Sequence, residues 1–172
     1  MKNLEYKASV GELNSLESIF IKNGAAFAGI LKQRDTYFAV NAGRLKLRET
    51  GGKEAELIFY ERDESSSSGM ESRYEIFPVP DPSLKDSLAK ALGVKTIVEK
   101  VRRLLKLKNA RIHLDEVKGL GSFLEFEVVS DGDDRADTAL LETLKTYAAP
   151  FVVREIKESY SDLMLRGEAA KI

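Results

Sequence analysis

The sequence contains no cysteine, a single histidine and four prolines among its 172 residues. The absence of cysteine excludes disulfide bonds and thiolate metal sites, and it fits a reducing compartment. No apolar segment approaches the ~20 residues that a membrane-spanning helix needs, and the start of the chain lacks the apolar run of a signal peptide. We therefore expect a cytoplasmic protein with no membrane partner.

An excess of charge of one sign is also missing. Lysine and arginine together number 27, aspartate and glutamate 28, and the formal net charge is −1. Bulk electrostatics give no reason for affinity to nucleic acid, so we do not expect a nucleic-acid partner. The length suits one domain with a substantial core, and we assign residues 1–172 to a single domain, as a monomer or a homodimer.

The sequence is instead rich in charges that alternate with apolar residues. Residues 44–48 read Arg-Leu-Lys-Leu-Arg, so a strand here projects three cations from one face and two leucines from the other. The same alternation recurs over 4–8, 100–102, 111–115 and 124–128. Several strands are therefore expected to carry charge on one face and an apolar row on the other.

The order of patterns along the chain indicates an α+β fold. Alternation and β propensity predict strands over 2–10, 26–40, 44–50, 55–62, 95–107, 110–117, 122–129 and 151–155, with another resuming at Ser72. Helical periodicity predicts helices over 11–23, 134–148 and 158–166, and a further helix opened by Asp81-Pro82. We interpret the serine run 65–68 as a hairpin loop. Short turns join most strands, which implies antiparallel pairing with amphipathic helices packed on the apolar face.

Helices outside such a sheet would leave the charged faces pointing inward, and a closed barrel would make them a lumen. The inner face then carries about four more cations than carboxylates, although the net charge is −1. The cations are Lys7, Arg44, Lys46, Arg48, Arg62, Lys100, Arg102 and Arg111, and the carboxylates are Glu5, Asp115, Glu125 and Glu127. A polyanion such as a triphosphate would offset this excess through charge-assisted hydrogen bonds. Glu5, Glu125 and Glu127 would hold a divalent cation, Mg²⁺ or Mn²⁺, beside the phosphates.

These motifs resemble the CYTH superfamily, the triphosphate tunnel metalloenzymes. The family's N-terminal Glu-x-Glu-x-Lys strand corresponds to Asn3-Leu4-Glu5-Tyr6-Lys7, in which Asn3 replaces the first glutamate. Further matches along nearly the whole chain are 35–38, 43–49, 99–102, 111–117, 120–127 and the closing helix near 159–163. The resemblance implies a closed antiparallel barrel, typically of eight strands, with helices outside. Its polar tunnel would hold a triphosphate through the eight cations and metal through Glu5, Glu125 and Glu127.

The leading functional hypothesis is metal-dependent hydrolysis of a small-molecule triphosphate, either inorganic, nucleoside or thiamine triphosphate. Lys46 and Arg102 would stabilise the transferring phosphoryl group, and Glu127 or Asp115 would orient the attacking water. One alternative is a class IV adenylyl cyclase that makes cyclic AMP and pyrophosphate. A second is a non-catalytic module that binds polyphosphate or nucleotide, which the Asn3 replacement supports. His113 is in phase with Arg111 and Asp115, and it either lines the tunnel or makes a structural hydrogen bond.

Overall fold

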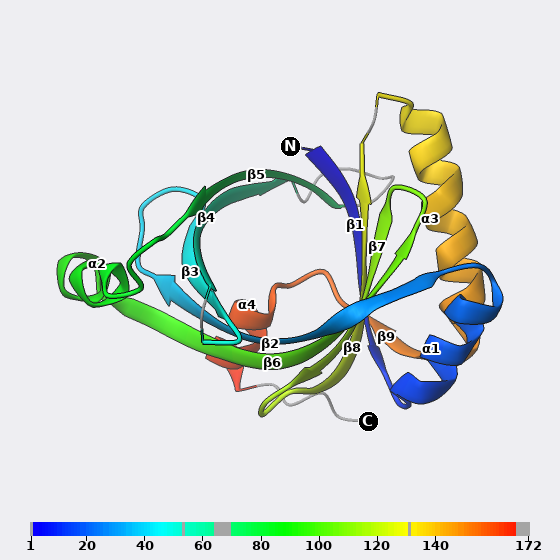
Figure 1. Cartoon of the computed structure of the whole chain (residues 1–172), viewed down its shortest axis with the longest axis horizontal. Helices are drawn as coiled ribbons and strands as arrows, with labels where there is room; N and C mark the ends of the chain where they lie inside the picture. Colours follow the sequence, from blue (N-terminus) through cyan, green and yellow to red (C-terminus); the bar gives the residue numbers. More distant parts are fainter. Residues whose placement is uncertain (1, 53, 64–69, 131, 168–172) are drawn as a thin grey trace.

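A computed structural model of the chain describes residues 2–52, 54–63, 70–130 and 132–167, leaving out the side chains of residues 2, 62, 63 and 70–72. This part of the chain forms nine strands and four helices (Figure 1). The strands are β1 (Lys2–Val10), β2 (Ala26–Phe38), β3 (Arg44–Thr50), β4 (Glu54–Asp63), β5 (Met70–Pro78), β6 (Val94–Leu107), β7 (Ala110–Val117), β8 (Gly121–Val129) and β9 (Val152–Glu155). The helices are α1 (Leu13–Lys22), α2 (Leu84–Leu92), α3 (Asp134–Ala148) and α4 (Tyr160–Arg166). The predicted serine loop lies outside the described residues.

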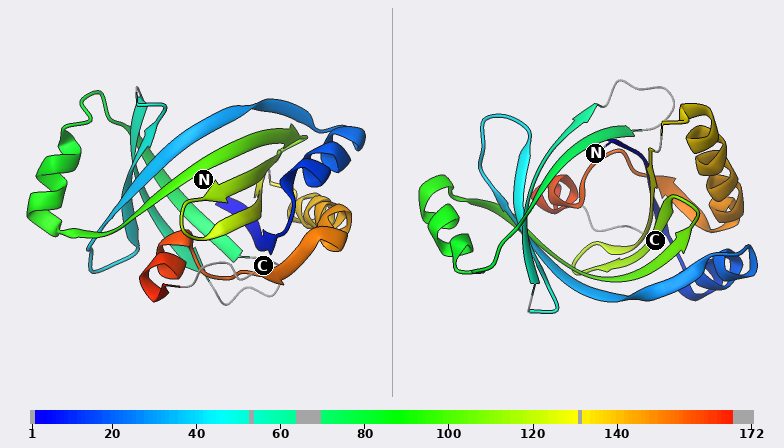
Figure 2. Two further views of the ribbon diagram at one scale, coloured as in Figure 1. Left: turned by 90° about the horizontal axis from the view of Figure 1, so that it is seen from below. Right: turned by 45° about the horizontal axis from the view of Figure 1, so that its top comes forward.

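The strands form one antiparallel sheet that curls round on itself (Figures 1 and 2). Its order is β5-β4-β3-β2-β6-β7-β8-β1-β9, and β5 returns to pair with β1. At this seam β5 pairs with Lys2–Glu5 of β1, whereas β9 pairs with Ala8–Val10. Eight strands thus complete the ring over half of β1, and the ninth occupies the rest of that edge. The expected α+β barrel of about eight strands is confirmed.

The two faces of the strands carry opposite kinds of side chain, as the alternation predicts. On β1, Leu4, Tyr6 and Ala8 belong to the largest core cluster, which continues through β7 and β8 into α1 and α3. Phe126 of β8 is fully buried there, stacked on Tyr6 and edge-on to Phe20 of α1. Helices α1 and α3 therefore pack on the outer face, and their apolar contacts fix which strand faces turn inward.

The helices are placed by local capping and by the sheet faces that they cover. Helix α2 packs over the outer face of β2, β3 and β4, near Phe38 and Leu47. It begins at Leu84 with Ser83 as N-cap, two residues later than Asp81-Pro82 predicts. The Asp81 carboxylate accepts the Ser83 N–H at 2.9 Å, as a capping residue does, but the residues between form a turn whose Leu84 N–H bonds the Asp81 carbonyl oxygen at 3.2 Å. No helix in the described part of the chain is long and apolar enough to cross a membrane.

Helix α4 differs from the expectation that every helix lies outside the ring. It lies across one end of the barrel, where Tyr160 and Leu163 join an interior cluster with residues of β2, β4, β6, β7 and β8 (Figure 2). A capping box fixes its start, since Ser159 and Asp162 bond each other's backbone N–H groups. The inner faces of the strands are apolar at this end, and α4 therefore buries them.

Truncating Phe126 tests whether the outer cluster fixes the barrel. We expect Phe126→Ala to lower the free energy of unfolding by about 3–5 kcal/mol, because it removes a fully buried ring and leaves a cavity. Leu165→Ala, which truncates a side chain 50% exposed on α4, is the matched control and should cost little. Urea denaturation measures both, and equal losses would contradict this placement of the core.

Candidate functional site

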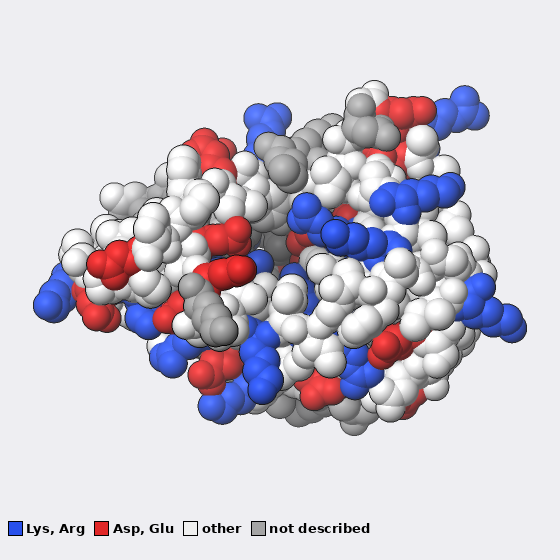
Figure 3. Space-filling view, in the orientation of Figure 1, with Lys and Arg blue, Asp and Glu red and all other residues white. Residues whose placement is uncertain are grey.

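A cavity of about 330 Å³ occupies the interior of the ring. Figure 3 shows the hollow from one side, with basic and acidic side chains around it. The residues that line it come from β1 to β8 and from the start of α4. Its charged lining residues are the cations Lys7, Lys46, Arg48, Lys100, Arg102, Lys106 and Arg111 and the carboxylates Asp35, Glu125 and Glu127. The described lining therefore carries more than twice as many cations as carboxylates.

Asp35 of β2 is the counter-ion of three of these cations. Its carboxylate accepts two bonds from Arg48, at 2.7 and 2.8 Å, and one each from the Nζ atoms of Lys46 and Lys100 at 3.0 Å. Burial alone would raise its pKa, but the three cations hold the pKa of Asp35 well below its usual range. Asp35 stays ionised and fixes the positions of all three cations.

Asp115 of β7 holds Arg102 in a similar way. Two bonds of 2.7 Å join the carboxylate to the Arg102 guanidinium, which lies opposite it on β6. The Tyr160 hydroxyl donates a third bond at 2.8 Å. Asp115 is fully buried and does not line the cavity. It positions Arg102 and links it to α4.

The two glutamates of β8 have longer ion pairs. Glu125 lies 3.6 Å from the Nζ of Lys7 and 3.7 Å from Arg102. Glu127 lies 3.6 Å from Arg111 and 3.9 Å from the Nε2 of His113. These separations exceed hydrogen-bond length, in contrast to the contacts of 2.7–3.0 Å around Asp35 and Asp115.

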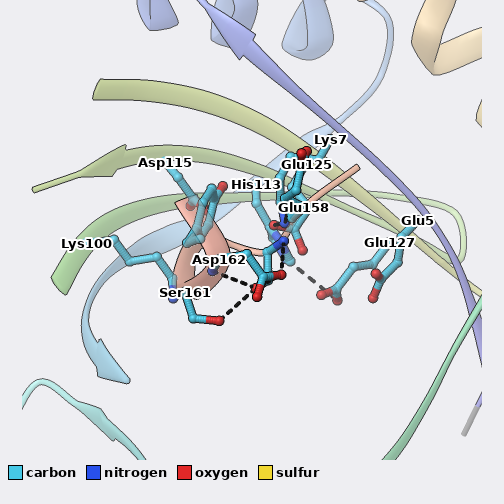
Figure 4. Close-up of polar contacts among 12 residues, drawn as sticks. Glu5, Lys7, Lys100, His113, Asp115, Glu125, Glu127, Glu158, Ser161 and Asp162 are labelled. Carbon is cyan, nitrogen blue, oxygen red and sulfur yellow. Dashed lines mark hydrogen bonds and ion pairs between the residues drawn. The ribbon is translucent and has the colours of Figure 1, made fainter. Parts of the chain in front are cut away.

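Glu5 of β1 faces the same region from the neighbouring strand. It is the direct cross-strand partner of Glu127, and Figure 4 shows the two carboxylates side by side. Like charges opposite each other destabilise a sheet unless a cation lies between them. The Tyr74 hydroxyl of β5 donates to Glu5. Asn3, two residues earlier, lines the cavity with a buried side-chain oxygen that accepts no hydrogen bond from the described residues. This set of oxygen donors fits a divalent cation.

His113 lies beside both glutamates of β8. It is the cross-strand partner of Glu125, and one ligand atom from each of His113, Glu125 and Glu127 lies within 4.8 Å of the others. Burial, with a contribution from the Arg102 guanidinium, lowers the pKa of His113 to about 4. Its imidazole is therefore neutral near pH 7. The tunnel-lining alternative for His113 is the one that the structure supports.

Burial also changes the acidity of Lys100. Desolvation lowers its pKa to about 7, and Arg48, Arg102 and Lys46 add to the effect, although Asp35 opposes it. The lysine thus exchanges its proton close to neutral pH. A bound anion would favour the protonated form.

Six of the eight predicted phosphate-binding cations line the cavity, one lies beside it and one side chain is not described. Arg44 donates to Asp162 of α4 at 2.8 Å and does not line the cavity. Arg62 belongs to β4, but its side chain lies outside the described residues. The remaining six all line the cavity, as do Glu125 and Glu127 of the predicted metal set.

Sequence reasoning missed four charged or polar residues of the site. Asp35, Lys106 and Tyr160 line the cavity, and Asp162 binds Arg44 beside it. Asp35 is in phase with Gln33 in the stretch 26–40, and Lys106 is in phase with Lys100 and Arg102 in the stretch 95–107. Continuing the alternation along both strands finds them. Because Asp35 adds one negative charge and Lys106 one positive charge, the cationic excess stays at about four.

A larger and more open groove, of about 870 Å³, touches Gln33 and Lys100 and extends past the turns that follow β3 and β7. Three of its charged residues pair with one another, with Glu99 lying 2.7 Å from Lys118 and 3.8 Å from Arg34. These side chains are exposed and well solvated, so their charges interact weakly. We place the site in the smaller cavity because its cations are buried.

The fold and the site define a barrel with a cation-lined interior. Comparison of the chain with known protein families and solved structures assigns it to a family. The CYTH domain model matches residues 1–160, so the chain belongs to the CYTH family. The PH1012 protein from Pyrococcus horikoshii OT3 has a similar structure, with a TM-score of 0.81 and 22% identity over 94% of this chain and 98% of that one. No curated protein matches the sequence.

Two further solved structures share the fold at lower identity. A candidate adenylate cyclase from Vibrio parahaemolyticus has a TM-score of 0.73 and 19% identity, covering 94% of this chain and 97% of its own. HpAC1 from Hippeastrum, described as a candidate adenylyl cyclase with a dominant triphosphatase activity, has a TM-score of 0.64 and 15% identity, covering 96% of each chain. At these identities the likeness establishes the fold alone.

Replacing Asp35 tests its role as the shared counter-ion. We expect Asp35→Asn to lower the free energy of unfolding by about 3–5 kcal/mol near pH 7, because it leaves buried cations uncompensated. The folded pKa is depressed, so this difference should be complete above the unfolded pKa of about 4 and shrink as the pH falls further. Urea denaturation at several pH values measures it. Glu99→Gln, which removes an exposed paired carboxylate, is the control, and equal stabilities for the two variants would contradict the assignment.

Proposed function

We propose that this protein hydrolyses a triphosphate in the cavity with the help of a divalent metal ion. The observation that carries the proposal is that the carboxylates of the interior form two groups with different contacts. Asp35 and Asp115 hold cations through short bonds, whereas Glu125 and Glu127 line the cavity and bring possible metal-ligand atoms together with His113. The cavity thus offers fixed positive charge for phosphates and, beside it, oxygen donors for a metal.

The cations supply what phosphoryl transfer requires most, which is positioning and neutralisation of charge. Lys46, Arg48 and Lys100 form one group around Asp35, and Arg102 stands next to them on β6. Their positions are set before any substrate binds, so little reorganisation accompanies the reaction. Arg111, with a side chain 44% exposed, lies toward the open part of the cavity and would receive the incoming anion.

Glu125 and Glu127 would hold the metal, with Glu5 adjacent and Asn3 as a further oxygen donor. When bound, a divalent ion neutralises phosphate charge and polarises a phosphoryl oxygen. The Asn3 replacement leaves this N-terminal strand with one carboxylate fewer than the family pattern. We therefore assign the protein a single high-affinity ion, Mg²⁺ or Mn²⁺.

Glu127 is the better of the two carboxylates considered for orienting water. Asp115 is fully buried, and its oxygens already accept bonds from Arg102 and Tyr160. Glu127 lines the cavity and is partly exposed. Water attacks the terminal phosphorus, its oxygen forms the new P–O bond, the bridging P–O bond breaks, and one proton passes to the carboxylate and then to solvent. The products are orthophosphate and the corresponding diphosphate.

A product assay tests the proposed reaction. We expect orthophosphate from at least one of tripolyphosphate, thiamine triphosphate, ATP and GTP, supplied with Mg²⁺ or Mn²⁺. Glu127→Gln should lower kcat by about 10²–10⁴-fold, because it removes the group that accepts the proton. Glu116→Gln, on the outer face of β7 with a side chain 59% exposed, is the matched control.

The other two functions give different results in the same assay. Cyclic nucleotide and pyrophosphate from ATP would identify a cyclase. Tight binding of tripolyphosphate without turnover would identify a non-catalytic module. Either result would contradict hydrolysis.

Lys100 provides a test that depends on binding alone. At pH 8 its amine is mostly neutral, because its pKa is about 7. A bound triphosphate raises that pKa, so binding should take up about one more proton than in Lys100→Met, and affinity should fall as the pH rises above 7. Calorimetry in two buffers of different ionisation enthalpy measures the uptake. Lys118→Met, with a side chain 79% exposed and outside the cavity, should match the unmodified protein. Equal uptake in Lys100→Met would contradict this role.

A further inference from the structure

His113, Glu125 and Glu127 bring one nitrogen and two carboxylates together on the inner faces of β7 and β8. The His113 Nε2 and Glu127 Oε2 atoms are 3.9 Å apart. Two ligands each about 2.1 Å from one ion can be separated by at most about 4.2 Å. This pair therefore spans a distance that a single metal ion can bridge, and Glu125 belongs to the same group.

The burial of His113 shows that its imidazole is kept inside the barrel at a cost, and the unsatisfied nitrogen is Nδ1, on the other side of the ring from the Nε2 that faces Glu127. Its side chain is 4% exposed, and the Nδ1 atom is buried without a hydrogen-bond partner among the described residues. A buried polar atom without a partner costs free energy, and such atoms require an explanation. A hydrophobic side chain would fill a purely structural position at lower cost.

The surrounding charges also favour a cation between these groups. Two glutamates lie within the same group of ligand atoms and repel each other, which favours a cation between them. Lys7, Arg102 and Arg111, at 3.6–3.7 Å, offset part of that negative charge. A divalent ion between the three ligands would be held by two negative charges and one neutral donor. The same ion would lie next to the phosphate-binding cations.

We propose that His113 is a ligand of the metal ion held by Glu125 and Glu127, and that this nitrogen makes the site prefer Mn²⁺ or Zn²⁺ to Mg²⁺. Imidazole suits first-row transition metals, whereas Mg²⁺ takes oxygen ligands almost exclusively. Glu5, which accepts from Tyr74, then lies outside the immediate ligand set and acts on the site through its charge. This inference rests on the metal site of the proposed function.

The presence of a single histidine allows a direct spectroscopic test. Pulsed EPR on Mn²⁺ bound to tag-free protein should show coupling to one imidazole nitrogen, and labelling histidine with ¹⁵N should change that coupling. The coupling should disappear in His113→Gln. Bound Mn²⁺ without nitrogen coupling, or coupling that persists in the variant, would overturn the proposal.

Metal affinities measured without substrate give the second readout. Calorimetry should show His113→Gln weakening Mn²⁺ and Zn²⁺ on the order of tenfold or more, with a smaller change for Mg²⁺. His113→Asn serves as a second variant if the first melts early, and Glu116→Gln should bind like the unmodified protein. Equal losses for all three metals would overturn the proposal.

The two proposals fail in distinguishable ways. If Mg²⁺-dependent hydrolysis persists while Mn²⁺ shows no nitrogen coupling, the role of His113 fails and the proposed function stands. If neither Mn²⁺ nor Zn²⁺ binds, in the presence or absence of tripolyphosphate, the metal site itself is wrong and both proposals fail.

Discussion

The structure depends on burying cations inside a barrel, which is possible only because carboxylates compensate them there. Lys100 has a side chain 1% exposed, and Arg102 one 6% exposed. Charges this deep are tolerated when they are paired and hydrogen-bonded. Asp35 and Asp115 provide that pairing from β2 and β7 through contacts of 2.7–3.0 Å. The remaining excess of positive charge is the property that a polyanionic ligand would use.

The apolar outer face is the other half of this arrangement. Because α1 and α3 cover the apolar rows of β1, β7 and β8, the alternate residues of those strands must face the interior. Their charged side chains cannot reach bulk water on the outside. The hydrophobic contacts between helices and sheet thus produce the charged cavity, and α4 covers one of its ends.

Alternation in the sequence predicted most of this fold because each strand has one apolar face and one charged face. The inward direction of Lys7, Lys46, Arg102 and Glu125 follows from that pattern and the need to cover leucines with helices. The function of each carboxylate could not be predicted in the same way. Whether Asp115 binds Arg102 or water depends on distances across strands, and β6 and β7 set those distances. The position of α4 depends on tertiary packing of Tyr160, which no local pattern encodes.

The most direct test of the account is a crystal structure with Mn²⁺ and a non-hydrolysable triphosphate analogue. The account predicts the phosphates in the interior, bonded to Lys46, Arg48, Lys100 and Arg102, with the ion between them and the glutamates of β8. An analogue bound in the outer groove beside Glu99 and Lys118, with the interior cations still bonded only to Asp35 and Asp115, would contradict it.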